Sequence, residues 1–254
     1  ARRIWARLIK ERYGAKKPQS LRLRFHAQTA GSTLTAQQPE NNIVRVALQA
    51  FAAVCGGTQS LHTNGYDEAL ALPTERAARI ALRTQQILAH EAGVTATVDP
   101  FAGSYFIEAL TAEIEERAGE LIAKVDELGG SVNAIAFMKG EIEESAWGYQ
   151  ERYRQGQDIV VGVNKYVTDQ VDDVDILKVD PEAEQRQLTR LRAFKENRDQ
   201  AEVDAKLDSL RDVARGEGNL LHPIRAALKA NASIGEVCGA MREVFGEYKG
   251  GAFF

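Results

Sequence analysis

The chain has 254 residues, of which 44% are hydrophobic and 27% charged, a composition typical of a folded globular protein and not of a disordered one. A formal net charge of −4 argues against a nucleic-acid partner, and no apolar run is long enough to span a bilayer. The two cysteines, Cys55 and Cys238, lie far apart in the sequence and suit reduced thiols in a cytoplasm. We therefore expect a cytoplasmic protein with no nucleic-acid or membrane partner.

Residues 1–98 alternate between helical and strand patterns. The predicted elements are a helix over residues 1–13, a strand over 21–27, a loop over 31–38, a helix over 39–54, a strand over 58–61 and a helix over 73–92. This order indicates parallel α/β structure. Parallel strands that are buried on both sides need neighbours, so we expect the rest of the sheet to come from upstream or from a partner. The chain also lacks an initiating Met, and we expect it to begin within a longer protein.

Helical patterns dominate after residue 98. The predicted elements are helices over residues 105–128, 132–138, 141–154, 183–215, 220–230 and 234–245, a β run over 159–163 and an acidic linker over 172–179. Ser233 is the expected N-cap of the last helix. The sequence thus divides into an α/β part over residues 1–98 and a mostly α-helical tail over residues 99–254.

Polar side chains occupy both predicted strands, where a buried parallel strand would carry Val, Ile and Leu. His26 and Gln28 are two residues apart and share one face of the first strand, and Thr58 and Ser60 share a face of the second. Polar strand ends that lead into loops rich in Gly, Thr and Asn are typical of the C-terminal mouth of a (β/α) barrel. We expect His26 and Gln28 to face a ligand cavity; the alternative is a core histidine and amide bonded to a neighbouring loop.

The loops after these strands carry further candidate binding groups. A carboxylate such as Glu68 can accept hydrogen bonds from two neighbouring hydroxyls of a sugar, although an acidic residue here could also stabilise the first turn of a helix. Gly31 suits the close approach of a flat ligand or merely a tight turn. The sequence has no dinucleotide fingerprint, P-loop, nucleophile elbow or zinc motif, so we expect a cofactor to carry any difficult chemistry and we expect no protein metal site.

Residues 23–84 closely resemble the coenzyme-B12-dependent acyl-CoA mutases, the family of methylmalonyl-CoA mutase. The resemblance rests on Arg-Phe-His-x-Gln-Thr-x-Gly at residues 24–31, Gly-Gly-Thr-Gln-Ser-Leu-His-Thr-Asn at 56–64 and Val-Gly-Val-Asn-Lys-Tyr at 161–166. It implies an α/β fold class. Residues 1–98 would form the last two βα units of a TIM (β/α)8 barrel, and residues 99–254 a mostly α-helical tail that contacts other subunits.

The resemblance also implies roles for single residues. Gln59 is implied to face the acyl-CoA reaction centre, and His26 is the second catalytic candidate because of its place on the polar strand face. The implied contacts to adenosylcobalamin (coenzyme B12) are Gln28, Gly31, Asn64, Glu68 and Ala69. Among these, Gln28 and Gly31 would lie against the corrin, and Glu68 would hold the adenosyl ribose.

The implied activity is the radical 1,2-rearrangement of a branched acyl-CoA, either methylmalonyl-CoA to succinyl-CoA or a substrate of the isobutyryl-CoA type. Ala27, Ala30 and Ser32 depart from the methylmalonyl-specific pattern and lean toward the isobutyryl-CoA or 2-hydroxyisobutyryl-CoA branch. The Asp-x-His-x-x-Gly signature of the family's cobalamin-binding domain and the first barrel strands do not occur in the sequence.

The expected partners are therefore an acyl-CoA substrate, a cobalamin-binding subunit or domain, the N-terminal half of the barrel and another large subunit. We expect the isolated chain to be inactive as an isomerase. The alternative functions are a non-catalytic module that docks the cobalamin-binding subunit or a second large subunit, and a stand-alone scaffold produced by a split gene.

Overall fold

The computed structural model describes residues 1–169 and 174–248. Contacts divide the chain into two compact units, Ala1–Leu177 and Lys178–Phe254. The boundary predicted between residues 98 and 99 stays a prediction. It divides barrel units from a tail, whereas the two observed units are defined by contacts between residues. Within the described ranges, no helix is both long and apolar enough to cross a membrane.

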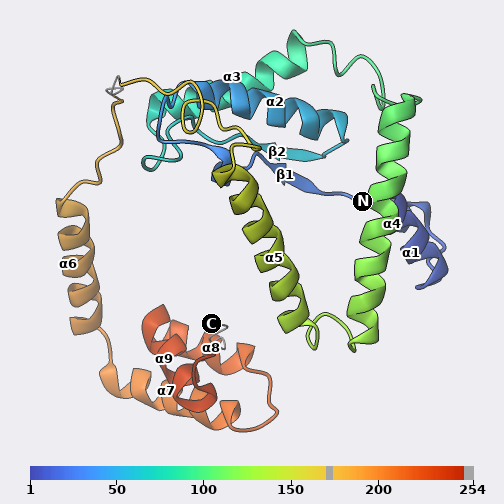
Figure 1. Cartoon of the computed structure of the whole chain (residues 1–254). Coiled ribbons are helices and arrows are strands. Elements are labelled where there is room, and N and C mark those ends of the chain that lie inside the picture. Colours follow the sequence, from blue (N-terminus) through green and yellow to red (C-terminus); the bar gives the residue numbers. More distant parts are fainter. Residues whose placement is uncertain (170–173, 249–254) are drawn as a thin grey trace. The chain divides into compact units, whose positions relative to one another are not determined.

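The first unit combines α-helices with a small parallel sheet (Figure 1). Its elements in chain order are α1 (Arg2–Glu11), the 3₁₀ helix η1 (Pro18–Leu21), β1 (His26–Gln28), the 3₁₀ helix η2 (Gly31–Thr33), α2 (Asn41–Cys55), β2 (Ser60–His62), α3 (Glu75–His90), α4 (Tyr105–Glu127) and α5 (Ile135–Arg154). The fold is thus mostly helical α/β, as the alternation of patterns predicts. Within residues 1–169 and 174–248 the sheet has two strands, and a complete barrel is not seen.

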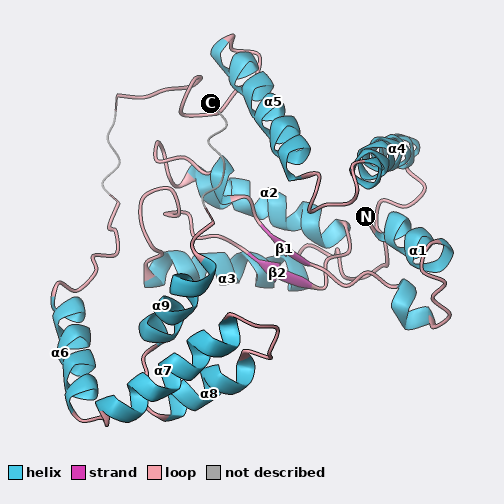
Figure 2. Cartoon of the chain, turned by 90° about the horizontal axis from the view of Figure 1, so that it is seen from below, coloured by secondary structure: helices cyan, strands magenta, loops and turns pink. Residues whose placement is uncertain are grey.

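The two strands run parallel, with His26 opposite Ser60 and Gln28 opposite His62. Helices α2 and α3 lie over the same face of this strand pair (Figures 1 and 2). On that face the central residue of each strand is half-buried, whereas the four outer residues are exposed on the other. The sheet therefore has one face covered by helices and one polar face that no part of the described first unit covers closely.

Helices α2 and α3 pack together through small and branched side chains at helical spacing. The buried residues of the two helices are Asn42, Val46, Ala50 and Cys55 in α2 and Ala77, Ala81, Thr84 and Leu88 in α3. The intervals of three to five residues place each set on one helix face. Three of these eight residues are alanines, whose small side chains allow close packing of the helices.

The strands are shorter than predicted and begin later. The strand predicted over residues 21–27 is wrong for residues 21–25: Leu21 ends a 3₁₀ turn that Pro18 starts, and β1 begins only at His26. The strand predicted over 58–61 begins only at Ser60. Three residues of β1 pair with three residues of β2. The extended residues before them are not strand, because an extended segment becomes a strand only where a neighbouring segment bonds to it.

Two other predictions for the first unit need correction. The β run predicted over residues 159–163 is wrong, because the chain folds into a closed turn with a single bridge between Val161 and Lys165. The helices predicted over 132–138 and 141–154 form the single helix α5, which passes through Gly140 without a break, at the usual cost of a mid-helix glycine. The long helix predicted over 105–128 is confirmed by α4.

The regular elements in the described part of the second unit are all helices. Its elements are α6 (Glu182–Glu196), α7 (Gln200–Ala214), α8 (Leu221–Lys229) and α9 (Ile234–Phe245). The single helix predicted over residues 183–215 is wrong, because Asp199 leaves helical geometry and its side chain accepts from the backbone N–H of Glu202, which starts α7. Residues 172 and 173 of the predicted linker lie outside the described residues, and 174–179 form no regular element.

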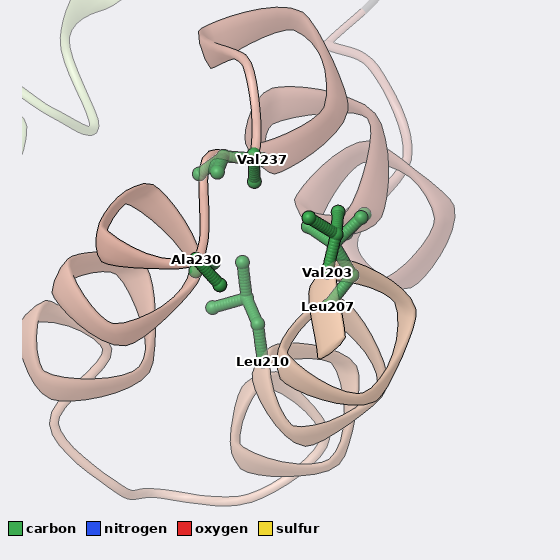
Figure 3. Packing of buried hydrophobic residues seen from close by; sticks show 8 residues of the cluster. Val203, Leu207, Leu210, Ala230 and Val237 are labelled. Atoms are coloured by element: carbon green, nitrogen blue, oxygen red, sulfur yellow. The ribbon is translucent and has the colours of Figure 1, made fainter. Parts of the chain in front are cut away.

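Helices α7, α8 and α9 enclose a small hydrophobic core (Figure 3). Its buried members are Val203, Leu207, Leu210, Ala227, Ala230, Ala232, Val237 and Ala240. The bounds of α9 and its N-cap are confirmed: Ser233 and Glu236 form a capping box, in which each side chain bonds to the backbone of the other residue.

Candidate functional site

The polar face of the sheet carries two imidazoles, an amide and a hydroxyl. His26 Nδ1 lies 2.8 Å from Ser60 Oγ, so the paired strands also pair these two side chains. His62 is exposed opposite Gln28. The sequence predicts that His26 and Gln28 share a face away from Ala27, and the alternation of exposure along β1 agrees. This face presents several hydrogen-bonding groups that a ligand could contact.

Asn64 joins the two loops that leave the strands. Its side chain is buried, accepts a hydrogen bond from Gln28 Nε2 at 3.1 Å and donates one to the carbonyl of Thr29 at 3.0 Å. Its backbone N–H donates to Thr29 Oγ1 at 3.0 Å. Three hydrogen bonds to Gln28 and Thr29 therefore fix the position of Asn64 in the loop after β2.

Gly31 brings the backbone of the first loop against the second loop. A Cβ atom at Gly31 would lie 2.9 Å from Asn64 Nδ2 and 3.2 Å from Glu68 Oε1. Only glycine permits such an approach without displacing a side chain. Glu68 is exposed, and Ala69 beside it is exposed as well. Four of the five predicted cofactor contacts thus meet at the carboxyl ends of two parallel strands, with Ala69 next in the chain.

A buried carboxylate shapes the loop that carries Glu68. Asp67 Oδ2 accepts hydrogen bonds from the backbone N–H of Thr74 at 2.9 Å and from Thr74 Oγ1 at 3.1 Å. Thr74 is also the N-cap of α3 and accepts from the N–H of Ala77. Asp67 therefore ties the loop to the start of α3. Its carboxylate is buried, whereas the carboxylate of the neighbouring Glu68 is exposed.

Gln59 is not brought together with the other predicted site residues. Its Oε1 accepts from the backbone N–H of Phe25 at 2.8 Å, and its Nε2 donates to the carbonyl of Gly57 at 2.7 Å. The residue lines a cavity of about 270 Å³ that Leu61 and Gln85 also line. Its amide thus bonds to the backbone at the start of the strands, and its predicted catalytic role stays a prediction.

The remaining groups suit a polar organic ligand. Among the described residues, no three His, Cys, Asp or Glu side chains lie close enough together to hold a metal ion. The groups that converge at the strand ends are amides and hydroxyls with the exposed carboxylate of Glu68. That carboxylate can accept hydrogen bonds from two sugar hydroxyls, and Gly31 lets the loop after β1 lie directly against Glu68. The arrangement fits an adenosyl and corrin ligand.

Sequence reasoning missed the polar residues of α2 that hold the two loops. Asn42 is fully buried, and its Nδ2 donates to the carbonyls of Thr35 and Tyr66, both at 2.9 Å. One side chain thus fixes the loop after β1 and the loop after β2. A signal for this role was available, because Asn42 lies four residues before Val46 on the buried face of an apolar helix.

The chain has close relatives among known proteins. Residues 1–247 match the family described as Methylmalonyl-CoA mutase. The methylmalonyl-CoA mutase of Rhizobium meliloti (strain 1021) is 48% identical over 252 residues, which are 98% of this chain and 35% of the relative. The 2-hydroxyisobutanoyl-CoA mutase large subunit of Aquincola tertiaricarbonis is 44% identical over 252 residues, which are 98% of this chain and 45% of the relative.

A probable mitochondrial methylmalonyl-CoA mutase of Caenorhabditis elegans is 45% identical over 251 residues, or 98% of this chain and 34% of the relative. The chain therefore spans between 34% and 45% of the length of these three relatives. The family match, in contrast, leaves out only the last few residues of the chain. The chain belongs to the methylmalonyl-CoA mutase family.

Proposed function

We propose that this chain is part of the catalytic subunit of an adenosylcobalamin-dependent acyl-CoA mutase, an isomerase that rearranges a branched acyl-CoA. The observation that carries the proposal is the meeting of Gln28, Gly31, Asn64 and Glu68 at the carboxyl ends of two parallel strands. Ligands of α/β sheets and barrels bind at such strand ends. Relatives with two different acyl-CoA names leave methylmalonyl-CoA and a 2-hydroxyisobutanoyl type as the two candidate substrates.

Each residue of the site has a task in this proposal. Glu68 would hold the adenosyl ribose through its hydroxyls, and Gly31 would let its loop, which faces the corrin in this proposal, pack against Glu68. Gln28 and Asn64 hold these two loops at a fixed distance, so the binding groups are oriented before the ligand arrives. Adenosylcobalamin, when bound, supplies the carbon-centred radical chemistry that no side chain can provide.

The polar strand face would line the path of the acyl-CoA. His26 and Ser60 already bond to each other, which orients the imidazole before substrate binding. A TIM barrel is usually filled by branched aliphatic side chains, so imidazole, amide and hydroxyl groups on the inner face favour a barrel with an open, solvated or substrate-filled axis. In this proposal β1 and β2 are its last two strands, and the remaining strands and the cobalamin-binding domain complete the enzyme.

A chimeric enzyme tests the proposed function. The region of the Rhizobium meliloti relative that matches this chain is replaced by residues 1–247, and the chimera is assayed with adenosylcobalamin and with methylmalonyl-CoA or 2-hydroxyisobutanoyl-CoA. We expect isomerisation of at least one substrate, because this chain and the region it replaces are 48% identical. The 254-residue chain alone should show no turnover.

Two variants make the test specific. Glu68→Ala should weaken adenosylcobalamin binding by about tenfold or more, since a charged acceptor to two hydroxyls is lost. The matched control is Glu75→Ala on the first turn of α3. The Glu75 side chain is 94% exposed, so this variant should leave binding unchanged. A folded chimera that binds no adenosylcobalamin, or an equal response of the two variants, would refute the proposal. The names of the relatives favour catalysis over the docking-module alternative.

A further inference from the structure

A segment far along the chain returns to the loop that carries Gly31. Gln38 Nε2 donates a hydrogen bond to the carbonyl of Tyr166 at 3.0 Å, and Arg45 Nη2 donates one to the carbonyl of Val161 at 2.7 Å. Both acceptors lie within residues 158–168, which we name the strap. The strap thus contacts the end of the loop after β1 and the first half of α2, more than a hundred residues away in sequence.

The strap is closed on itself by its own hydrogen bonds. Asn164 Oδ1 accepts from the N–H of Val160 at 2.7 Å, and Asn164 Nδ2 donates to the carbonyl of Asp158 at 2.8 Å. The N–H of Gly162 donates to the carbonyl of Lys165 at 2.8 Å. These bonds hold the strap as a compact turn, so the carbonyls that it offers to Gln38 and Arg45 occupy defined positions.

Arg45 connects the strap to the loop after β1. Its Nη1 donates to Thr35 Oγ1 at 3.0 Å and to Asn42 Oδ1 at 2.7 Å, while Nη2 holds Val161. Asn42 in turn bonds to the backbone of Thr35 through both its amide atoms. A planar guanidinium with several fixed donors is suited to such a junction, and a lysine could satisfy only part of it.

The contact at Gln38 is tight on both sides. Gln38 has a φ of 47°, which is uncommon for a residue with a side chain, and Gly162 opposite has a φ of 81°. A Cβ atom at Gly162 would lie 2.9 Å from Gln38 Cδ. A strained backbone persists only where surrounding contacts hold it, and here the strap supplies them. The loop after β1 is therefore fixed at its far end by the strap.

We propose that Arg45 and Gln38 are positioning residues: by binding the strap they fix residues 30–38, hence the place of Gly31, and so set the affinity of the site for adenosylcobalamin. The inference rests on the proposed function. The near end of the same loop is already held, because the N–H of Ala30 donates to Gln49 Oε1 at 2.6 Å. Gln49 lies one helical turn after Arg45, so α2 presents two holding groups along one face.

Two measurements on Arg45→Gln test this role. In the 254-residue chain, hydrogen exchange of the amides of residues 32–37 should become about tenfold faster or more, because bonds from a charged donor are lost. In the chimeric mutase, the dissociation constant of adenosylcobalamin should rise about tenfold, with kcat at saturating cofactor within about twofold of the parent. Arg45→Lys should recover part of both effects.

Three further variants guard against a merely structural explanation. Gln38→Ala should give the same two changes more weakly, and it serves if the Arg45 variants do not fold. Val161→Ala should change neither, because Arg45 binds the backbone carbonyl and not the side chain of that residue. Arg76→Gln on α3 is the surface control, since Arg76 is exposed and has no ion pair within the described part of the chain.

The outcomes separate this inference from the proposed function. Unchanged exchange in Arg45→Gln, or faster exchange with an unchanged cofactor dissociation constant, would overturn the positioning role. If the parent chimera binds no adenosylcobalamin, the proposed function fails, and the role of Arg45 in fixing affinity fails with it. Exchange in the 254-residue chain would then still decide whether Arg45 holds residues 30–38.

Discussion

Gln28 donates a hydrogen bond from its side-chain amide to the buried side-chain oxygen of Asn64, 3.1 Å away. This single bond joins the end of β1 to the loop that leaves β2, 36 positions further along the chain. Asn64 uses its other amide atom to donate to the carbonyl of Thr29. An acceptor and a donor are therefore both required at position 64, and asparagine supplies both in one planar group.

Replacing Asn64 by aspartate should separate these two requirements. Asn64→Asp keeps an acceptor for Gln28 but sets a carboxylate oxygen against the carbonyl oxygen of Thr29, in a buried site. We expect the free energy of unfolding of the first unit to fall by about 2 kcal/mol. Urea unfolding followed by tryptophan fluorescence measures this, since Trp5 and Trp147 both lie in the first unit.

The matched control is Asn219→Asp in the second unit, whose unfolding is followed by circular dichroism because both tryptophans lie in the first unit. Asn219 is exposed, and its Oδ1 accepts from the N–H of Leu221 at the start of α8. An aspartate there keeps the acceptor and adds a negative charge near a helix N-terminus, which is neutral or favourable. Equal losses of stability in the two variants would show that the arrangement around Asn64 is not the cause.

The closeness of Gly31 to the second loop leads to a second prediction. Gly31 has a negative φ, so an alanine there is penalised only by space, and its Cβ would press on Asn64 and Glu68. Gly31→Ala should therefore weaken adenosylcobalamin binding by the chimeric mutase about tenfold or more while the helix content is retained. Titration of the chimera with adenosylcobalamin, followed by its absorption spectrum, gives the dissociation constant.

Gly119→Ala is the control for this prediction. Gly119 lies inside α4, and nothing is within 4 Å of the position of its Cβ. Alanine should raise helix stability by about 0.5–1 kcal/mol and leave cofactor binding unchanged. Tight binding by Gly31→Ala would mean that the close packing of Gly31 against Asn64 and Glu68 does not set the affinity for the cofactor.

Much of the site was predictable because its residues are close in sequence. The placement of Gln28 and His26 on one exposed face follows from the two-residue period of a strand, and the loops follow from glycine and asparagine. The family patterns then named the residues that meet at the strand ends. The bounds of α9 were equally readable, because Ser233 and Glu236 are three residues apart and form a local capping box.

What could not be predicted depends on contacts between distant residues. The bond from Arg45 to Val161 joins positions 116 apart, and neither residue carries a local signal for it. The same holds for Gln59, whose side-chain amide oxygen accepts from the backbone N–H of Phe25, just before β1. The break between α6 and α7 was local, but a charged run without Gly or Pro hid the N-cap at Asp199.

The ion pair of Arg198 and Glu236 gives the second unit a pH-dependent stability. Two hydrogen bonds join the groups, at 2.8 and 2.6 Å, and the Arg198 side chain is only 2% exposed. The bonded guanidinium of Arg198, together with Ser233, holds the pKa of the Glu236 carboxyl far below its ordinary value. Lys195 also approaches the carboxylate, at 3.6 Å.

Because the pKa of Glu236 is lowered by folding, its contribution is fully present above the unfolded value of about 4.3 and is lost as the pH falls. Glu236→Gln should lower the unfolding free energy by about 3 kcal/mol near neutral pH, since Arg198 stays buried without its anion. The difference between parent and variant should shrink below about pH 4.

Urea unfolding followed by circular dichroism, repeated at several pH values, checks this prediction. Other carboxylates with lowered pKa values, such as Glu243 beside Arg211, remain in both proteins and cancel in the difference. Glu202→Gln is the control, because Glu202 is exposed in the first turn of α7 and its variant should follow the pH profile of the parent. A difference that stays constant down to low pH would contradict the role of the ion pair.

The last prediction concerns the core of the second unit. Leu210 is fully buried between α7 and the helices that face it (Figure 3). Leu210→Ala removes three side-chain carbon atoms and leaves a cavity, which should cost about 3 kcal/mol. This is a large part of the stability of a small bundle whose buried members include four alanines, so its helices should unfold at clearly lower urea concentration.

Two readouts and a control decide whether the effect stays within the second unit. The second unit has no tryptophan, so tryptophan fluorescence follows the first unit alone, and its urea midpoint should not move in Leu210→Ala. Circular dichroism, in contrast, should show an early loss of helix. Leu221→Ala removes the same groups from a side chain that is 70% exposed and should cost less than about 0.5 kcal/mol. If Leu210→Ala shifts both signals together, the two units unfold as one. The division of the chain near Leu177 would then reflect the distribution of contacts and not two independently stable units.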